Sequence, residues 1–362
     1  MTRVAMKTTP FASEFRAVDF FCGAGGMTHG LRSAGIHVLG GIDNALQCKD
    51  SYERNNFPAR FIHHDIASLR FEELSELLGI AVKDSQLIFV GCSPCQYWSK
   101  IQTSRTKSAQ TAFLLKEFQR FVEYFLPGFV VLENVPGLKH NKESYLPHFL
   151  SFLESQGYYY AHGIVDASRY GVPQHRLRYL LIASRSVSSV TLPEPSENRV
   201  WVRDVLGESN GFPCIPAGHI DHTPFLHTSS ALSEKNLRRI RLTPHDGGTR
   251  HSWKDDPELQ INAYRGKDSI FVDVYGRMCW DRPAPTITTK FNSISNGRFG
   301  HPEEDRAISL REGACLQSFP RDYLFFDTNL QGIARQIGNA VPPLLSEKIG
   351  QHIIRMVSYG NV

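Results

Sequence analysis

The 362-residue chain is predicted to be an α/β protein with a Rossmann-like sheet and a smaller, irregular second domain. Seven apolar runs rich in β-forming residues occupy the first half, and helix-like segments separate several of them. From about residue 186 this alternation stops, and Ser, Pro, Gly, His and Arg become frequent. Strand–helix alternation implies a mostly parallel sheet that helices cover on both faces.

The predicted elements follow in chain order. Strands are expected at 17–21, 37–42, 60–62, 86–91, 129–134, 158–165 and 177–183. Helices are expected at 26–34, 44–56, 69–78, 110–125 and 143–156. A last helical segment is expected near 331–357, where Pro342 and Pro343 suit a helix start. We therefore divide the chain into a large domain (1–185), a small domain with a hinge (186–330) and a C-terminal segment (331–362).

Composition excludes several classes of protein. Hydrophobic residues make up 41% and charged residues 21% of the chain, which is typical of a globular protein. No apolar run approaches the roughly 18 residues that span a bilayer. Seven scattered cysteines, with one CxxC pair and no second, predict neither a disulfide framework nor a structural zinc site. We expect a reducing, cytoplasmic setting and no membrane. The formal charge of +4 is only weak evidence for a nucleic-acid partner.

A glycine-rich turn follows the first predicted strand. In DFFCGAGG (19–26), Gly23 and Gly25 would let the backbone approach a ligand at the carboxyl end of the sheet. Asp43 lies about 20 residues further on, where a carboxylate can bind ribose hydroxyls. Asp65, after the third strand, could accept a hydrogen bond from an adenine amino group. The alternative for both aspartates is a helix-capping role.

The stretch GCSPCQYWSK (91–100) allows two interpretations. Cys92 and Cys95 have the spacing of a redox pair, whereas Cys95 alone could be a nucleophile at the end of the fourth strand. Glu133 ends the neighbouring fifth strand, so a thiol and a carboxyl group would face one crevice. Such a pair beside a nucleoside-bearing cofactor suits methylation of a pyrimidine. A thiolate that adds to ring carbon 6 makes carbon 5 nucleophilic, and a carboxyl group can stabilise that species through ring nitrogen 3.

With these residues in place, the sequence resembles the DNA cytosine-5 methyltransferases of the bacterial type. Six segments resemble the family's motifs, in the family's order and over nearly the whole chain. They are DFFCGAGG, SPCQ, ENV, QHRLR (174–178), RPAPTIT (282–288) and QIGNAVPP (336–343). The resemblance implies an S-adenosylmethionine-dependent methyltransferase sheet, a small target-recognition domain and duplex DNA as the substrate. The target cytosine would be flipped out of the duplex.

The resemblance also implies roles for individual residues. Cys95 would be the nucleophile, and Glu133 would contact nitrogen 3 of cytosine. Arg176 and Arg178 would hold the catalytic pocket, with Arg178 reaching the cytosine carbonyl.

The cofactor site implied by the resemblance is lined by Phe21, Asp65 and Asn339. The C-terminal segment should return to the large domain, because the family's last motif packs beside its first. One departure concerns the ribose ligand: the family often has an acidic residue two positions before Asp43, where this chain has Gly41.

Two basic segments are candidates for DNA contacts. The loop at 99–111 carries Lys100, Arg105 and Lys107 and no acidic residue, and the family closes this loop over DNA. Residues 235–254 carry six Lys or Arg against one acid, Asp246, and fit a recognition element. The alternative for each segment is a solvated surface. The residues assigned to DNA are Lys100, Arg105, Lys107, Arg238, Arg239, Arg241, Arg250 and Arg282.

Three other functions stay open at this point. They are a thiol oxidoreductase that uses Cys92 and Cys95, the same methyl transfer on RNA, and a DNA-binding module without catalysis. The first leaves the glycine turn, ENV and GNAVPP without a role. We expect a monomer without a metal, paired in function with a restriction endonuclease. The DNA target is not a readable code in the sequence.

Overall fold

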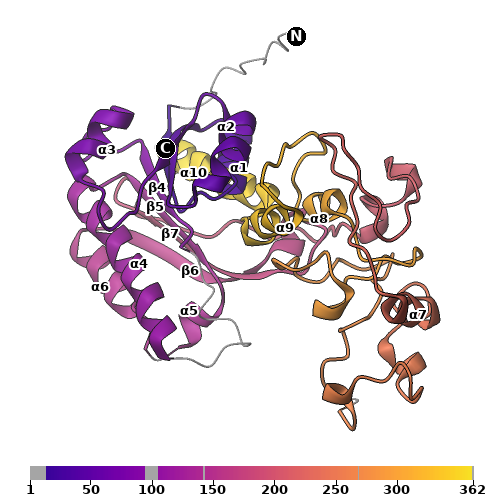
Figure 1. Cartoon of the computed structure of the whole chain (residues 1–362). Coiled ribbons are helices and arrows are strands. Elements are labelled where there is room, and N and C mark those ends of the chain that lie inside the picture. The colour runs from indigo at the N-terminus through magenta and orange to yellow at the C-terminus, as the bar shows by residue number, and fades with distance from the viewer. Residues whose placement is uncertain (1–13, 94–104, 142, 268, 361–362) are drawn as a thin grey trace, which may run out of the picture.

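The computed structural model describes residues 14–93, 105–141, 143–267 and 269–360, and it contains one seven-stranded sheet (Figure 1). The strand order is β3-β2-β1-β4-β5-β7-β6. Neighbouring strands are parallel except that β7 is antiparallel to both β5 and β6. The strands are β1 (Arg16–Phe20), β2 (His37–Asp43), β3 (Arg60–His63), β4 (Leu87–Gly91), β5 (Phe129–Asn134), β6 (Tyr159–Asp166) and β7 (Leu177–Ser184).

Helices cover both faces of the sheet because successive strand residues alternate between two cores. In β4, Ile88 and Val90 pack into one core, while Leu87 and Phe89 pack into the other. The first core lies under α1 (Gly26–Ser33), α2 (Lys49–Asn56) and α10 (Pro343–Gly360). The second lies under α3 (Phe71–Leu78), α4 (Arg105–Phe125) and α6 (Leu146–Ser155) (Figure 1). A short helix, α5 (Gly137–His140), follows β5.

The predicted fold class and all seven predicted strands are confirmed, and so is the helical segment near 331–357 with a helix start at its two prolines. The segment forms two helices, α9 (Leu330–Asn339) and α10, which begins at Pro343. The break has a local cause. Pro342 disfavours helical backbone at the residue before it and supplies no N–H of its own.

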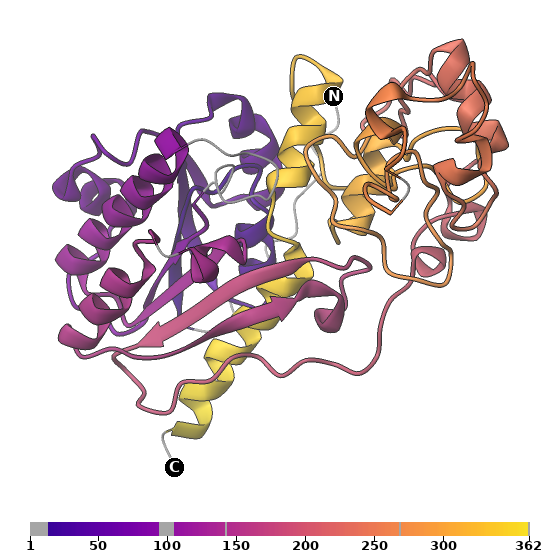
Figure 2. The ribbon, with the colours of Figure 1, turned by 90° about the horizontal axis from the view of Figure 1, so that it is seen from below.

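The chain leaves the sheet after β7 and enters an irregular region. Figure 2 shows the segment after β7 running along the sheet before it reaches the small domain. The regular helices described there are α7 (Glu234–Leu242) and α8 (Leu310–Leu316), accompanied by short 3₁₀ turns. A third core joins Val202, Phe212 and Phe291 of this region to Ala24 and to Ile337 of α9. The small domain is thus packed against the end of β1.

Within the described part of the chain, no helix combines the length and the apolar character that a membrane span requires.

Candidate active site

The glycine turn at the end of β1 is held by β2. The backbone N–H groups of Phe21 and Cys22 both donate to the carbonyl of Ile42, at 2.8 and 3.1 Å. The N–H of Gly23 donates to Asp43 Oδ2 at 2.8 Å. Phe21 itself has φ 64°, a left-handed backbone that a bulky residue rarely adopts. Strain of this kind is typical of functional sites.

The glycines let two other segments approach this turn. At Gly25, where φ is 91°, a Cβ atom would lie 2.3 Å from Asn56 Nδ2. At Gly26 a Cβ atom would lie 2.3 Å from the carbonyl oxygen of Val341, and at Gly30 it would lie 2.1 Å from that of Pro343. The last motif and the start of α10 therefore pack directly on the turn and on α1.

The turn also leaves room for a cofactor. A Cβ atom at Gly23 would meet no heavy atom within 4 Å, so open space adjoins the backbone there. This arrangement fits the predicted S-adenosylmethionine site, because backbone at a strand end can approach a ligand closely.

The structure explains the departure at Gly41. A Cβ atom there would lie 2.6 Å from Cys22 Cβ and 2.7 Å from Tyr52 Cε2, so no acidic side chain fits. Asp43 uses Oδ2 for Gly23 and accepts a hydrogen bond from Ala45 N–H at Oδ1, at 2.8 Å. Its visible role is to hold the turn, and a direct contact with ribose stays a prediction.

The two other predicted cofactor residues are exposed. Asp65 follows β3 and accepts a hydrogen bond from Ala67 N–H at 3.0 Å within a turn, and its contact with a cofactor stays a prediction. Asn339 is the last residue of α9, and its contact with a cofactor also stays a prediction.

Glu133 lies at the end of β5, one residue beyond the Leu132 that pairs with Gly91 of β4. It is only 6% exposed, and Arg178 Nε lies 3.0 Å from its Oε1. Apart from this ion pair with Arg178, Oε1 accepts no hydrogen bond from the described residues. Burial raises the pKa of Glu133, and the charges of Arg178 and Arg176 oppose the rise. A buried carboxyl group with unused hydrogen-bonding capacity is suited to bind a polar ring edge.

Arg176 joins three of the motifs. It is buried, and its guanidinium group donates to the carbonyls of Ile287, Gly338 and Ala340 at 3.0 to 3.1 Å. Gln174 adds a hydrogen bond, because its side-chain oxygen accepts from Ile287 N–H at 2.8 Å. The hydrogen bonds of Arg176 and Gln174 therefore hold three segments together: QHRLR, RPAPTIT and GNAVPP. A contact between Arg176 and substrate stays a prediction.

No role is predicted for Asn134, yet it contacts the segment that leads to the predicted nucleophile. Its Nδ2 donates to Ser93 Oγ at 3.1 Å, and its Oδ1 accepts from Val135 N–H at 2.9 Å. Both Asn134 and Ser93 are buried. The only signal in the sequence was the position of Asn134 next to Glu133 at the strand end.

Several predicted residues cannot be placed. Cys95 and Lys100 lie outside the described residues, as do the side chains of Arg105 and Lys107 at the start of α4. Cys92 is described: it is partly buried, packs against the first core, and donates its N–H to the carbonyl of Phe20 at 3.2 Å.

The predicted DNA contacts of Arg239 and Arg250 need correction. Arg239 is buried, donates to the carbonyl of Leu259 at 2.9 Å and lies over the ring of Trp253. Arg250 is buried and donates to the carbonyl of Lys267 at 2.9 Å. Both guanidinium groups stabilise the small domain from inside. Their burial removes them from the surface that DNA could reach.

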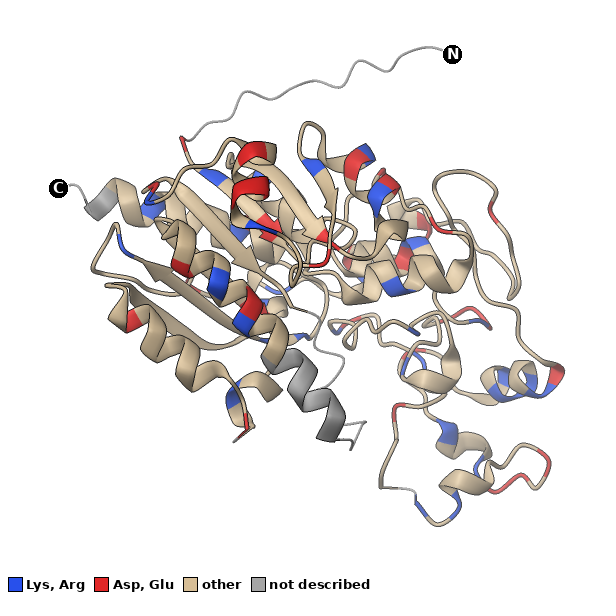
Figure 3. Cartoon of the chain, turned by 60° about the vertical axis from the view of Figure 1, so that its left-hand side comes forward, with Lys and Arg blue, Asp and Glu red and all other residues tan. Residues whose placement is uncertain are grey.

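The other basic residues of the small domain stay candidates. Arg238 is exposed and pairs with Glu258 at 2.6 Å, and exposed Arg241 lies 3.8 Å from Asp305. Arg282 is also exposed. Basic and acidic residues are interspersed over this domain (Figure 3). Exposed ion pairs contribute little stability, so a phosphate could replace the carboxylates as partner.

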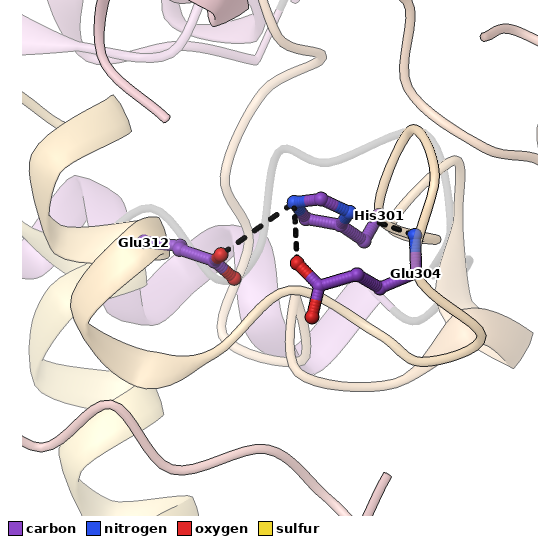
Figure 4. Close-up of side chains that lie close together, drawn as sticks. All are labelled: His301, Glu304 and Glu312. Carbon is purple, nitrogen blue, oxygen red and sulfur yellow. Dashed lines mark hydrogen bonds and ion pairs between the residues drawn. The ribbon is translucent and has the colours of Figure 1, made fainter. Parts of the chain in front are cut away.

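A buried charged cluster in the small domain resembles a metal site. Donor atoms of His301, Glu304 and Glu312 lie within 4.8 Å of one another (Figure 4). Arg306, however, binds Glu312 Oε2 at 2.7 Å and Glu304 Oε1 at 2.8 Å. Burial would raise the pKa of Glu312, but Arg306 lowers it to about 2. We interpret the cluster as an ion-pair network around Arg306.

The sheet and its glycine turn define a Rossmann-like α/β protein with room for a cofactor, and comparisons with known proteins give its family. The sequence model of the family described as C-5 cytosine-specific DNA methylase matches residues 15–355. The chain is 41% identical over 350 residues to the Type II methylase M.HgiDII of Herpetosiphon aurantiacus, covering 94% of this chain and 95% of that protein. It is 32% identical to the Type II methyltransferase M1.BsuMI of Bacillus subtilis, covering 93% and 80%.

Solved structures agree on the fold. A prophage-encoded E. coli chain described as a DNA modification methyltransferase matches with a TM-score of 0.73 at 21% identity, covering 95% of this chain and all of that one. The methyltransferase EhMeth of Entamoeba histolytica matches with a TM-score of 0.65 at 14% identity, covering 95% and 99%. The chain belongs to the C-5 cytosine-specific DNA methylase family. It is a DNA cytosine-5 methyltransferase that uses S-adenosylmethionine, and a thiol oxidoreductase receives no support.

Proposed function

We propose that the protein methylates cytosine at carbon 5 within one short duplex sequence, with Cys95 as nucleophile and Glu133 as the group that binds nitrogen 3. The observation that carries this proposal is the position of Glu133. Its buried carboxyl group lies at the end of β5, beside the end of β4 from which the chain leads to Cys95. The Type II relatives support a place in a restriction–modification system, which acts on DNA in the cytoplasm.

The proposed reaction starts at carbon 6 of the flipped cytosine. The Cys95 thiolate adds there, and the electron pair moves to carbon 5. Glu133 donates a proton to nitrogen 3 and so stabilises the adduct. When bound, S-adenosylmethionine supplies the electrophilic methyl group that carbon 5 takes. Water takes the proton lost from carbon 5, the Glu133 carboxylate takes back the proton of nitrogen 3, and the Cys95 thiolate leaves carbon 6, which restores the aromatic ring.

The residues proposed to hold the cofactor are those of the glycine turn, together with Asp65 and Asn339. Arg178 is proposed to reach the cytosine carbonyl, because its guanidinium group already lies beside Glu133. Exposed Arg238, Arg241 and Arg282 are proposed to contact DNA, together with Lys100, Arg105 and Lys107. We also propose that the enzyme works as a monomer.

Labelled methyl transfer tests the reaction. The protein is incubated with tritiated S-adenosylmethionine and mixed-sequence duplex DNA, and the product is digested to nucleosides. We expect the label in 5-methylcytosine. Label in N4-methylcytosine or N6-methyladenine alone would refute the proposal. Bisulfite sequencing of plasmid from expressing cells then identifies the target.

A graft tests the location of target recognition. We expect residues 186–281 to transfer the target when they replace the equivalent segment of a relative with a different known target. The graft begins after β7 and ends before RPAPTIT, because Ala284 and Ile287 bond to the QHRLR segment and belong to the scaffold. Bisulfite sequencing gives the hybrid's target. An active hybrid that keeps its host's target would place recognition elsewhere, and the reciprocal graft is the control.

A further inference from the structure

We propose that Tyr323 is a positioning residue for the cofactor turn, an inference that rests on the proposed cofactor site. Tyr323 is 2% exposed, and its hydroxyl donates to the carbonyl of Ala24, between Gly23 and Gly25. The same hydroxyl accepts a hydrogen bond from Asn56 Nδ2 at 3.1 Å. Because Asn56 supplies the donor, the tyrosine proton is directed at the turn.

The glycine turn needs a hydrogen-bond donor from another segment to hold its conformation. Glycine loses more conformational freedom on ordering than any other residue, and two glycines flank Ala24. Ala24 is buried, so a carbonyl there without a donor is costly. Tyr323 supplies a donor from a segment 299 residues away in sequence.

The segment that carries Tyr323 is fixed along α2. Leu324 N–H donates to Asn55 Oδ1 at 2.7 Å, and Asn55 Nδ2 donates back to the carbonyl of Leu324 at 2.7 Å. Phe326 N–H donates to Ser51 Oγ at 2.8 Å. Side chains of one helix thus hold alternate residues of the segment, much as a neighbouring strand would. The backbone next to Tyr323 is therefore held in place, and the Tyr323 side chain reaches the turn from there.

The backbone carbonyl of Tyr323 accepts a hydrogen bond from the small domain. The guanidinium group of Arg311 donates to the carbonyl of Tyr323 at 2.8 Å. It also donates to the carbonyls of Phe225 at 2.5 Å and Pro224 at 3.1 Å. Arg311 is 1% exposed, so these bonds are shielded from water. Through Arg311 and Tyr323, hydrogen bonds therefore link the 224–225 loop to the cofactor turn.

The test is Tyr323→Phe, which removes one hydroxyl and keeps the ring. The matched control is Tyr158→Phe, because the Tyr158 hydroxyl is also buried and donates to a carbonyl, that of Pro127, at 2.7 Å. Tyr158 lies just before β6, away from the turn. Both variants should lose comparable thermal stability. Only Tyr323→Phe should raise the Kd and the KM for S-adenosylmethionine, by about 3- to 10-fold, as expected for one buried hydrogen bond.

Two further readouts and a second variant separate positioning from a structural role. The kcat at saturating S-adenosylmethionine and the Kd for DNA should stay near the wild-type values in Tyr323→Phe. Asn56→Asp is the second variant, because a carboxylate in place of the amide should draw the tyrosine proton away from Ala24 and raise the same Kd. It also covers the case in which Tyr323→Phe folds poorly.

The outcomes distinguish this inference from the proposed function. A wild-type enzyme that binds the cofactor and makes 5-methylcytosine, with both variants unchanged in cofactor Kd, would overturn the role of Tyr323 alone. An equal rise in Kd in the Tyr158→Phe control would overturn it too, since the effect would follow from lost stability. A wild-type protein that binds no S-adenosylmethionine would overturn both.

Discussion

Replacing Cys95 with serine is expected to reduce turnover below detection, whereas replacing Cys92 with alanine is expected to leave it largely intact. A thiolate can add to the pyrimidine ring, but a serine hydroxyl stays protonated near neutral pH and is a poor nucleophile. Cys92 packs against the first core as a small apolar residue. Cys92→Ala should therefore cost some stability and little activity.

Covalent trapping shows directly which cysteine attacks the cytosine ring. Duplex DNA with 5-fluorocytosine at the target cannot lose its substituent at carbon 5, so the adduct persists on a denaturing gel. Wild type and Cys92→Ala should both form it, and Cys95→Ser should not. An adduct that survives the loss of Cys95, or a Cys92–Cys95 disulfide that turnover requires, would contradict a single nucleophilic thiolate.

The second large effect is expected for Glu133→Gln, which should slow methyl transfer by about 10²- to 10⁴-fold, the usual contribution of general-acid catalysis. The amide keeps the shape of the side chain but cannot give a proton to nitrogen 3. Single-turnover kinetics isolate this step, and DNA binding should stay nearly unchanged. The control is Glu117→Gln, which removes a partly buried carboxylate that pairs with Arg120 at 2.9 Å on α4. A wild-type rate in Glu133→Gln would make Glu133 structural.

The same variant should change the pH dependence. Burial raises the pKa of Glu133, so the protonated carboxyl group persists to higher pH than in an ordinary glutamate. Because that form is the proton donor, the wild-type rate constant should fall as pH rises through this pKa. Glu133→Gln should lose that fall, since its amide does not titrate. A fall of equal size in the variant would assign the titration to another group.

The large domain could be predicted closely because its signals are local. Each strand is a short apolar run whose alternate residues face the two cores. The apolar run in the sequence is therefore enough to locate the strand. The placement of Glu133 at a strand end followed from the same pattern. The helical C-terminal segment and the helix start at its two prolines were also predicted from local signals, since α10 begins at Pro343. The same two prolines that suggested a helix start also required the preceding helix to end.

The small domain shows why the rest could not be predicted. A count of basic residues treats Arg239 and Arg250 like their exposed neighbours, although aromatic rings and carbonyls from distant segments bury them. The exclusion of a side chain at Gly41 depends on Tyr52, which only the folded packing brings into contact. The link between Tyr323 and Ala24 spans nearly the whole chain and has no periodic signal.

The packing of α10 on α1 sets an order of events during protein synthesis. Ser346 Oγ donates to the carbonyl of Met27 at 2.6 Å across 319 residues of sequence. At about 5 to 20 residues per second, a ribosome makes Met27 roughly 15 to 60 s before Ser346. During this interval the apolar side of α1 has no α10 to cover it, because α10 has not yet been made. A nascent chain can therefore cover the apolar side of α1 with α10 only after residues 186–330 have been made.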